Sequence, residues 1–124
     1  MSKWTHITGA IHIDTFRELD KPQLKEHIEG ELVKAPQITG SEGNAETFVN
    51  VLGGYNTWSY DVELDMDMEY QTDVVITLNG DLRDRETIET LAEAKAFLEF
   101  LRKKFHILNY AITIENDGGY RTSL

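Results

Sequence analysis

The order of its hydrophobic patterns constrains this chain more than any single motif. Apolar residues first alternate with polar ones along residues 4–16, which is typical of a half-buried strand. They then recur every fourth residue between Asp20 and Ala35, and Pro36 ends this helix because the residue before a proline avoids helical geometry. A short strand is expected at 46–52. The first half of the chain therefore predicts a strand, a helix and a second strand.

The second half of the chain repeats these elements with stronger signals. Residues 72–79 alternate β-branched and apolar side chains, which favours a strand. Apolar residues at steps of three and four then predict a helix over about residues 85–105, with basic residues in its last turn. A final strand is expected at 109–115. Residues 80–84 are expected to form the turn before the second helix.

Together these elements give the order strand, helix, strand, strand, helix, strand. This order predicts an α+β protein, a ferredoxin-like βαββαβ sandwich with an antiparallel sheet and two helices on one face. The strand from Thr72 should lie between the first two strands. Residues 53–70 form an insertion that could add a hairpin. The chain is expected to be one domain over residues 1–124, with a flexible tail at 116–124.

Charge and cysteine content exclude several functional classes. The chain has 22 acidic and 12 basic residues, a net charge of −10, which argues against direct nucleic-acid binding. It has no cysteine, so disulfides and thiolate chemistry are excluded. No apolar run approaches the roughly 20 residues that span a bilayer, and the N-terminus lacks the apolar region of a signal peptide. A cytoplasmic protein without membrane association is expected.

The predicted topology brings several unusual loops to one end of the sheet. Residues 39–44 and 80–84 both contain glycines and both should lie where the first strand begins. Glycines that flank a Ser-Glu pair permit close backbone approach to a ligand, and an arginine near a helix start can hold an anion. The candidate ligand-binding residues are Trp4, Ser41, Glu42, Gly43, Asp81 and Arg83.

The same residues also have a purely structural interpretation. The glycines could mark tight connections, Asp84 could cap the second helix, and Arg83 could be the ion-pair partner of Asp84. The Gly-Ser-Glu-Gly sequence is not a phosphate-binding P-loop, which ends in Gly-Lys-Ser/Thr. Both interpretations stay open on the sequence alone.

Acidic and apolar residues alternate without interruption from Asp61 to Tyr70. As a strand, this segment places its carboxylates on one face, where like charges repel. It could be a solvated edge that resists aggregation, a decoy surface for a basic partner, or a divalent-cation site without EF-hand spacing. The candidate partner-binding residues, called here the acidic ribbon, are Asp61, Glu63, Asp65, Asp67 and Glu69.

The histidines and carboxylates do not indicate an enzyme. His6 and His12 share a strand face but lie roughly 20 Å apart, so they cannot ligate one metal ion. Ser41 has no evident base apart from His6 on the neighbouring strand, and a Glu42–Asp81 carboxylate pair is the candidate for acid–base chemistry. We expect no catalytic residues, no metal site and no cofactor.

The outer face of the predicted sheet is small, mixed and rather apolar. This composition suits cover by residues 53–70 or a homodimer formed sheet to sheet. An RNA-recognition surface would instead carry stacked aromatic and basic residues. The residues on this face are His6, Thr8, Ala10, His12, Val75, Thr77, Ala111 and Thr113.

Three short motifs carry a resemblance to a group of proteins. In chain order they are Trp4-Thr5-His6-Ile7-Thr8-Gly9, Gly40-Ser41-Glu42-Gly43 and Gly80-Asp81-Leu82-Arg83-Asp84. In this order they resemble small uncharacterised proteins of tailed phages and prophages of Gram-positive bacteria. The resemblance covers the two ends of the domain better than its middle, where residues 50–71 depart as an insertion. It implies a phage accessory protein in the cytoplasm of the host cell, and it transfers no catalytic residue.

Three functional hypotheses follow. The first is a non-enzymatic phage protein that engages a host factor or ligand during infection, for host takeover or counter-defence, with the acidic ribbon as contact surface. The second is a protein that binds or sequesters a nucleotide-type anionic ligand through residues 40–43 and 80–84. The third is a small hydrolase at that same end. A pull-down from bacterial lysate would detect a protein partner, basic or otherwise, and native mass spectrometry would then detect a retained small molecule.

Overall fold

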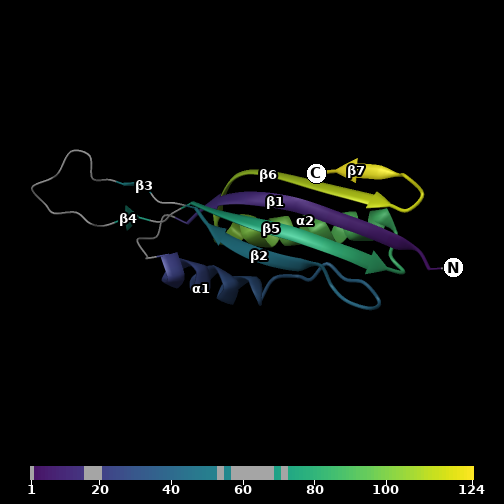
Figure 1. Cartoon of the computed structure of the whole chain (residues 1–124), viewed down its shortest axis with the longest axis horizontal. Helices are drawn as coiled ribbons and strands as arrows, with labels where there is room; N and C mark the ends of the chain where they lie inside the picture. The colour runs from purple at the N-terminus through teal and green to yellow at the C-terminus, as the bar shows by residue number, and fades with distance from the viewer. Residues whose placement is uncertain (1, 16–20, 53–54, 57–68, 71–72) are drawn as a thin grey trace, which may run out of the picture.

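The computed structural model describes residues 2–15, 21–52, 55–56, 69–70 and 73–124. Figure 1 shows how the helices and strands of this part are arranged. In chain order they are β1 (Trp4–Asp14), α1 (Lys21–Leu32), β2 (Glu46–Val51), β3 (Tyr55–Asn56), β4 (Glu69–Tyr70), β5 (Asp73–Arg83), α2 (Thr87–Lys104), β6 (His106–Asn116) and β7 (Arg121–Ser123).

The main sheet has five strands in the order β2-β5-β1-β6-β7, and every neighbouring pair is antiparallel. The predicted α+β class, with an antiparallel sheet and two helices, is confirmed. The predicted place of the strand from Thr72 is also confirmed, since β5 lies between β1 and β2. One strand, β7, was not predicted and adds an edge beside β6 (Figure 1).

The core lies on one face of this sheet. Alternate residues of a strand point to opposite faces, and in β1 the buried set Ile7, Ile11 and Ile13 has one parity. Buried residues of α1 and α2 belong to the same apolar cluster, which Leu24, Ile28 and Leu98 join from the helices. Burying an aliphatic side chain of this size stabilises a fold by about 1.5–3 kcal/mol, so this one-sided core holds both helices to the sheet.

The second helix begins later than the sequence predicts. Glu86 is its N-cap and forms a capping box with Glu89, so Asp84 is not the cap. Asp84 instead has a backbone φ of 59°, a left-handed conformation that Asp tolerates better than most residues. Ile88 is 70% exposed although it follows the three-and-four spacing of the apolar residues, because the buried face of α2 is formed by Thr90, Ala94, Phe97, Leu98 and Leu101.

The predicted turn at residues 80–84 is wrong, because β5 continues to Arg83. Leu82 is fully buried and pairs with Thr5 of β1. Gly80 occupies an inward position of this strand, where a Cβ atom would lie 2.8 Å from Ala45. Here glycine marks the close approach of another segment to a strand, not a turn.

The predicted flexible tail at 116–124 also differs from the structure. The chain turns after Asn116 and pairs β7 with β6, in a register that places Thr122 opposite Ile114. The Leu124 N–H donates to the Ile112 carbonyl at 2.9 Å, which extends the pairing by one residue. Residues 121–123 of this segment therefore form the last strand of the sheet.

The predicted hairpin in the insertion is seen only at its base. Tyr55 pairs with Tyr70, and Asn56 pairs with Glu69, as the two-stranded sheet β3-β4. Of the acidic ribbon, only the backbone of Glu69 belongs to the described residues. The other members, Asp61, Glu63, Asp65 and Asp67, lie outside them.

Candidate functional site

The two glycine-containing segments lie at the same end of the sheet, as predicted. The Ser41 N–H donates to the Arg83 carbonyl at 3.0 Å, and the Ser41 hydroxyl donates to Asp84 Oδ2 at 2.8 Å. The Arg83 guanidinium forms an ion pair with Glu42, and its Nε donates to the Ser2 hydroxyl at 3.0 Å. These polar groups satisfy one another, so they fasten residues 40–43 to the end of β5.

The two glycines of this segment differ in how closely other atoms approach them. A Cβ atom on Gly40 would lie 2.7 Å from the Gly43 carbonyl oxygen and 3.0 Å from Leu82 Cα. The bare backbone of Gly40 therefore lets the segment lie directly against β5. A Cβ atom on Gly43 would meet nothing within 4 Å, so neither packing nor backbone strain explains that glycine.

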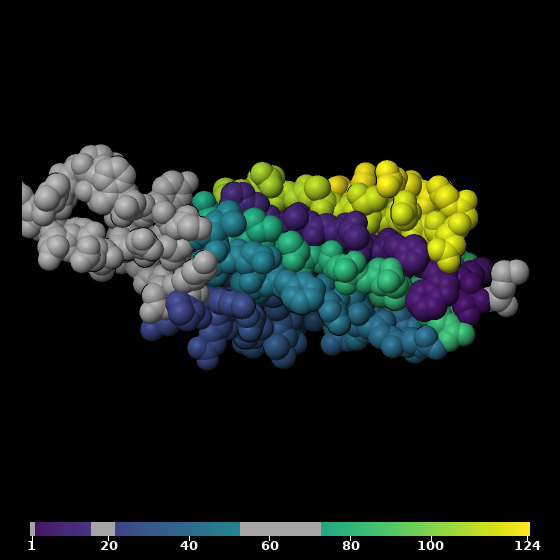
Figure 2. Space-filling model, viewed as in Figure 1, coloured from purple at the N-terminus to yellow at the C-terminus, as the bar shows by residue number. Residues whose placement is uncertain are grey.

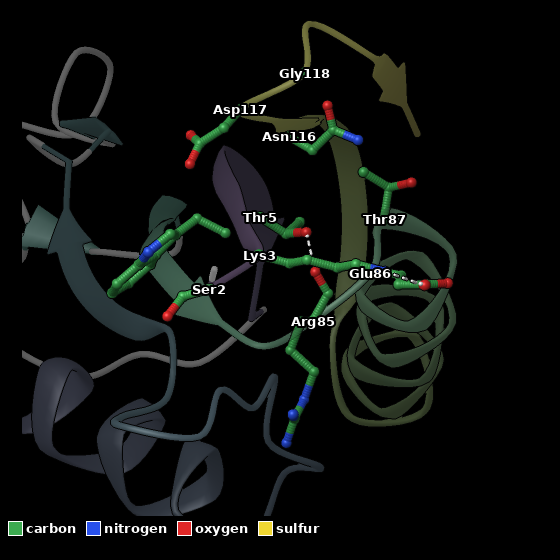
Figure 3. Close-up of a pocket in the computed structure, with 10 residues that line it drawn as sticks. Ser2, Lys3, Thr5, Arg85, Glu86, Thr87, Asn116, Asp117 and Gly118 are labelled. Carbon is green, nitrogen blue, oxygen red and sulfur yellow. Dashed lines mark hydrogen bonds and ion pairs between the residues drawn. The ribbon is translucent and has the colours of Figure 1, made fainter.

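The other predicted site residues separate into two further groups. Trp4 borders a cleft of about 420 Å³ between the start of β1, the start of α2 and the turn after β6. Figure 3 shows this cleft, in which the Lys3 ammonium reaches Glu86 at 3.1 Å and the Thr5 hydroxyl donates to the Arg85 carbonyl at 2.6 Å. The Arg85 guanidinium points away from the cleft and donates to the Asp84 carbonyl at 3.0 Å.

Asp81 belongs to a histidine cluster that the sequence did not reveal. The two ring nitrogens of His6 lie 2.7 Å from Asp81 Oδ1 and 2.7 Å from Asp117 Oδ1. Hydrogen bonds to Asp117 and then to Asp81 raise the pKa of His6 above its ordinary value of 6.5. The cluster joins β1, the end of β5 and the turn after β6. Glu42 and Asp81, the candidate pair for acid–base chemistry, bind different side chains. Arg83 forms an ion pair with Glu42, and His6 contacts Asp81.

The strand register identifies Asp81 but not Asp117. An antiparallel pairing of β1 with β5 puts His6 opposite Asp81, and alternation alone would place both on the outer face. Asp117 lies in the turn that connects β6 to β7. The sequence predicts a flexible tail over residues 116–124, so it does not predict this turn. The sequence contains one indication of Asp117, which is that it follows closely after the strand predicted at 109–115 and so lies at the end of the sheet where the first strand begins.

No helix lies over the outer face of the sheet in the part of the chain that the structure describes. Figure 2 views this face, where β2, β5, β1 and β6 lie side by side at the surface. Pairing places Ala10 between Thr77 and Ala111, and Thr8 between Asn79 and Thr113. Ala10 and Ala111 are both exposed. We call this surface the open face, and its central residues are Thr8, Ala10, His12, Phe48, Asn50, Val75, Thr77, Asn79, Asn109, Ala111 and Thr113.

The distribution of charge over the open face is uneven. Its centre contains no Asp, Glu, Lys or Arg, although these residues make up 27% of the chain. The margin of the face is acidic, and its two arginines, Arg83 and Arg121, are ion-paired to Glu42 and Glu115. The acidic residues of this margin are Asp14, Glu46, Asp73, Asp81, Glu115 and Asp117.

Two kinds of site are not found in the described part of the chain. No group of three or more His, Asp or Glu side chains is placed there to hold a metal ion. His12 Nε2 lies 3.8 Å from Asp73 Oδ1 at the far end of β1, whereas His6 contacts Asp81 and Asp117. Neither α1 nor α2 is long and apolar enough to cross a membrane.

The chain matches no protein-family model, no curated protein and no solved structure. Its geometry is therefore the basis for the function proposed below.

Proposed function

We propose that this chain is a non-enzymatic protein-binding module that engages its partner through the open face of its sheet. The observation that carries the proposal is the charge-poor centre of that face in a chain of net charge −10. A sheet face that only meets water needs no such depletion, because antiparallel sheets commonly carry charged and polar residues on the solvated side. Depletion of charged residues from a central patch is instead typical of a protein interface.

The dimensions of the open face also suit a protein partner. β1 has 11 residues. At about 3.3 Å per residue it is roughly 36 Å long. β5 and β6 are as long as β1, and β2 has six residues, so four strands about 4.8 Å wide give roughly 600 Å². The smaller stable interfaces bury about 600 Å² on each partner, so the face has the area of a small interface.

The acidic margin indicates the chemistry of the partner. Margin carboxylates such as Glu46 and Asp73 outnumber the arginines, and both arginines already have acidic partners. Complementary charge at the rim of an interface accelerates association and excludes like-charged surfaces. The partner should therefore present a flat surface of low charge, surrounded by basic side chains. A second copy of this acidic chain fits less well, because its margin would repel.

The resemblance to proteins of tailed phages gives this proposal a biological setting. In that setting the module is a phage accessory protein in the host cytoplasm, and its partner is a basic host factor engaged for takeover or counter-defence. The acidic ribbon would add carboxylates of the same sign, with Asp61, Glu63 and Asp65 among them. A ferredoxin-like core made of β2, β5, β1 and β6, with β7 added, belongs to the same proposal.

The alternative function is the binding or sequestration of a nucleotide-type anionic ligand by Ser41, Glu42 and Arg83. Their position at one end of the sheet favours it. Their hydrogen bonds to one another count against it, since a ligand would have to displace them. A small hydrolase at the same end would need a base for Ser41, whose hydroxyl is bonded to Asp84.

A capture experiment with matched variants tests the protein-binding proposal. Ala10→Arg and Ala111→Arg place a long cation in the centre of the open face, and Ala96→Arg makes the same change at an exposed position of α2. Each immobilised variant is exposed to lysate of a Gram-positive bacterium. The proposal expects proteins retained by wild type and by Ala96→Arg but lost from both face variants. Equal retention by all four proteins would contradict it.

A further inference from the structure

The His6 cluster ties three segments that are far apart in the sequence. His6 lies in β1, Asp81 lies near the end of β5, and Asp117 lies in the turn between β6 and β7. Each ring nitrogen of His6 meets one carboxylate oxygen at 2.7 Å. His6 is about one-third exposed, with a side-chain exposure of 34%, so protons exchange with it readily.

The geometry requires a particular protonation state. An ionised carboxylate only accepts hydrogen bonds, so each ring nitrogen must donate one. Only the doubly protonated imidazolium carries two N–H groups, because the neutral ring has one donor and one acceptor. Loss of one proton would place a nitrogen lone pair against a carboxylate oxygen. One of the two bonds must then be released.

We propose that His6 is a proton-operated clasp that holds the turn after β6 against β5 when protonated and releases it when neutral. The turn keeps its own shape, because Asn116 Oδ1 accepts the Tyr120 N–H at 3.0 Å and the Asn116 carbonyl accepts the Gly119 N–H at 3.1 Å. The clasp therefore docks a preformed turn and does not fold it. This inference is independent of the partner proposed above.

The surroundings of His6 favour the charged ring. Glu115 of β6 lies opposite His6 and is paired with Arg121 of β7, and Arg83 lies beyond Asp81 on β5. Within β1, the residues on the same face are Trp4 and Thr8, which carry no charge. Carboxylates thus face His6 from β5, β6 and the turn, and both nearby arginines already have acidic partners.

The sign of the pH effect follows from this environment. Hydrogen bonds to Asp117, and then to Asp81, raise the pKa of His6 above 6.5 in the folded protein. The clasp therefore contributes its full stabilisation below the pKa of an unfolded histidine, and this contribution is lost as the pH rises through the raised pKa. Release of the turn would change the cleft beside Trp4, because Asn116, Asp117 and Gly118 of the turn line one of its walls.

Nuclear magnetic resonance of the intact protein tests the clasp directly. Imidazole and backbone ¹⁵N shifts are followed from about pH 5 to about pH 9, across the range in which histidine titrates. The clasp predicts a His6 pKa above 6.5, with the amides of residues 117–119 titrating at the same pKa. His6→Gln should abolish the titration of these amides.

Asp117→Asn is the sharper variant, because an Asn side chain can donate to an unprotonated ring nitrogen. It should lower the pKa of His6 and remove the titration of the turn, while the turn stays docked at all pH values. The resonances of His27, which packs edge-on against Phe105, should not respond to Asp117→Asn. A His6 pKa at or below 6.5, or a turn in Asp117→Asn that titrates as in wild type, would overturn the proposal.

Discussion

Individual side chains at the end of the sheet serve two separate purposes. Arg83 binds Glu42 and Ser2 and so fastens residues 40–43 to β5. His6 binds Asp81 and Asp117 and so connects β5 to the turn after β6. Asp81 and Arg83, which lie on the same face of β5, therefore stabilise two different attachments.

Two glycines three positions apart should respond differently to substitution. Gly40→Ala places a Cβ atom 2.7 Å from the Gly43 carbonyl oxygen, where only backbone can move, whereas Gly43→Ala meets nothing within 4 Å. We expect Gly40→Ala to lower the free energy of unfolding by about 1–3 kcal/mol, as overpacking does, and Gly43→Ala to change it little. Urea denaturation of both variants measures this difference. Equal stabilities would show that residues 40–43 do not lie against β5.

Arg83→Ala separates the structural role of Arg83 from a ligand-binding role. The ion pair of Arg83 is partly exposed, and exposed pairs contribute roughly 0.2–1 kcal/mol, so only a small loss of stability is expected. Because Arg83 is already engaged by Glu42 and Ser2, inorganic phosphate should raise the melting temperature of neither wild type nor variant. A phosphate-dependent rise in wild type that Arg83→Ala abolishes would favour the anion-binding alternative.

At the scale of elements, hydrophobic periodicity predicts the long strands and both helices. The predicted element boundaries are wrong where a glycine or an aspartate is compatible with more than one local structure. Gly80-Asp81 resembles a turn, but Gly80 stands at an inward strand position that Ala45 crowds. Asp84 resembles a helix cap, but it adopts a left-handed turn, and Glu86 is the cap. Such choices depend on contacts between segments that sequence spacing does not contain.

The same limit explains the candidate site. Pairing of two predicted strands brings Ser41, Glu42 and Arg83 to one end, so their proximity could be predicted. The cluster of His6 with Asp117 could not, because it depends on the turn that β7 creates. β7 itself is three residues long, too short for a periodic signal.

Hydrogen exchange distinguishes a paired β7 from a flexible tail. The N–H groups of Asn116 and Leu124 bond to Tyr120 and Ile112, at 3.0 Å and 2.9 Å. We expect both amides to exchange more slowly than unstructured amides, because a hydrogen-bonded amide must open before it exchanges. Exchange of both at the rate of an unstructured peptide would mean that the tail is unpaired in solution.

At the scale of the whole molecule, the negative charge surrounds a face whose centre carries none of it. This arrangement predicts fast, salt-dependent association with a basic partner, since exposed charges are screened over about 8–10 Å at physiological ionic strength. The open face would then supply the contact area that holds the complex together.

Replacing Asp61, Asp65 and Asp67 with Asn tests the acidic ribbon separately. As a decoy surface, the ribbon would associate more slowly with the partner after this change, with little effect on dissociation. If the ribbon is only a solvated edge, the substitutions would reduce the repulsion between its carboxylates and would not change partner binding. As a cation site, it would make wild type more stable in calcium or magnesium and the variant insensitive to both. Association rates at two salt concentrations and melting temperatures with each ion separate the three.

The most direct test of the central claim is the dissociation constant of the captured partner for wild type, Ala10→Arg and Ala96→Arg. The two variants make the same chemical change, one at the centre of the open face and one on the exposed side of α2. If the open face is the interface, Ala10→Arg should weaken binding at least about tenfold, equivalent to about 1.4 kcal/mol, while Ala96→Arg stays near wild type. Equal dissociation constants for both variants and wild type would contradict the account.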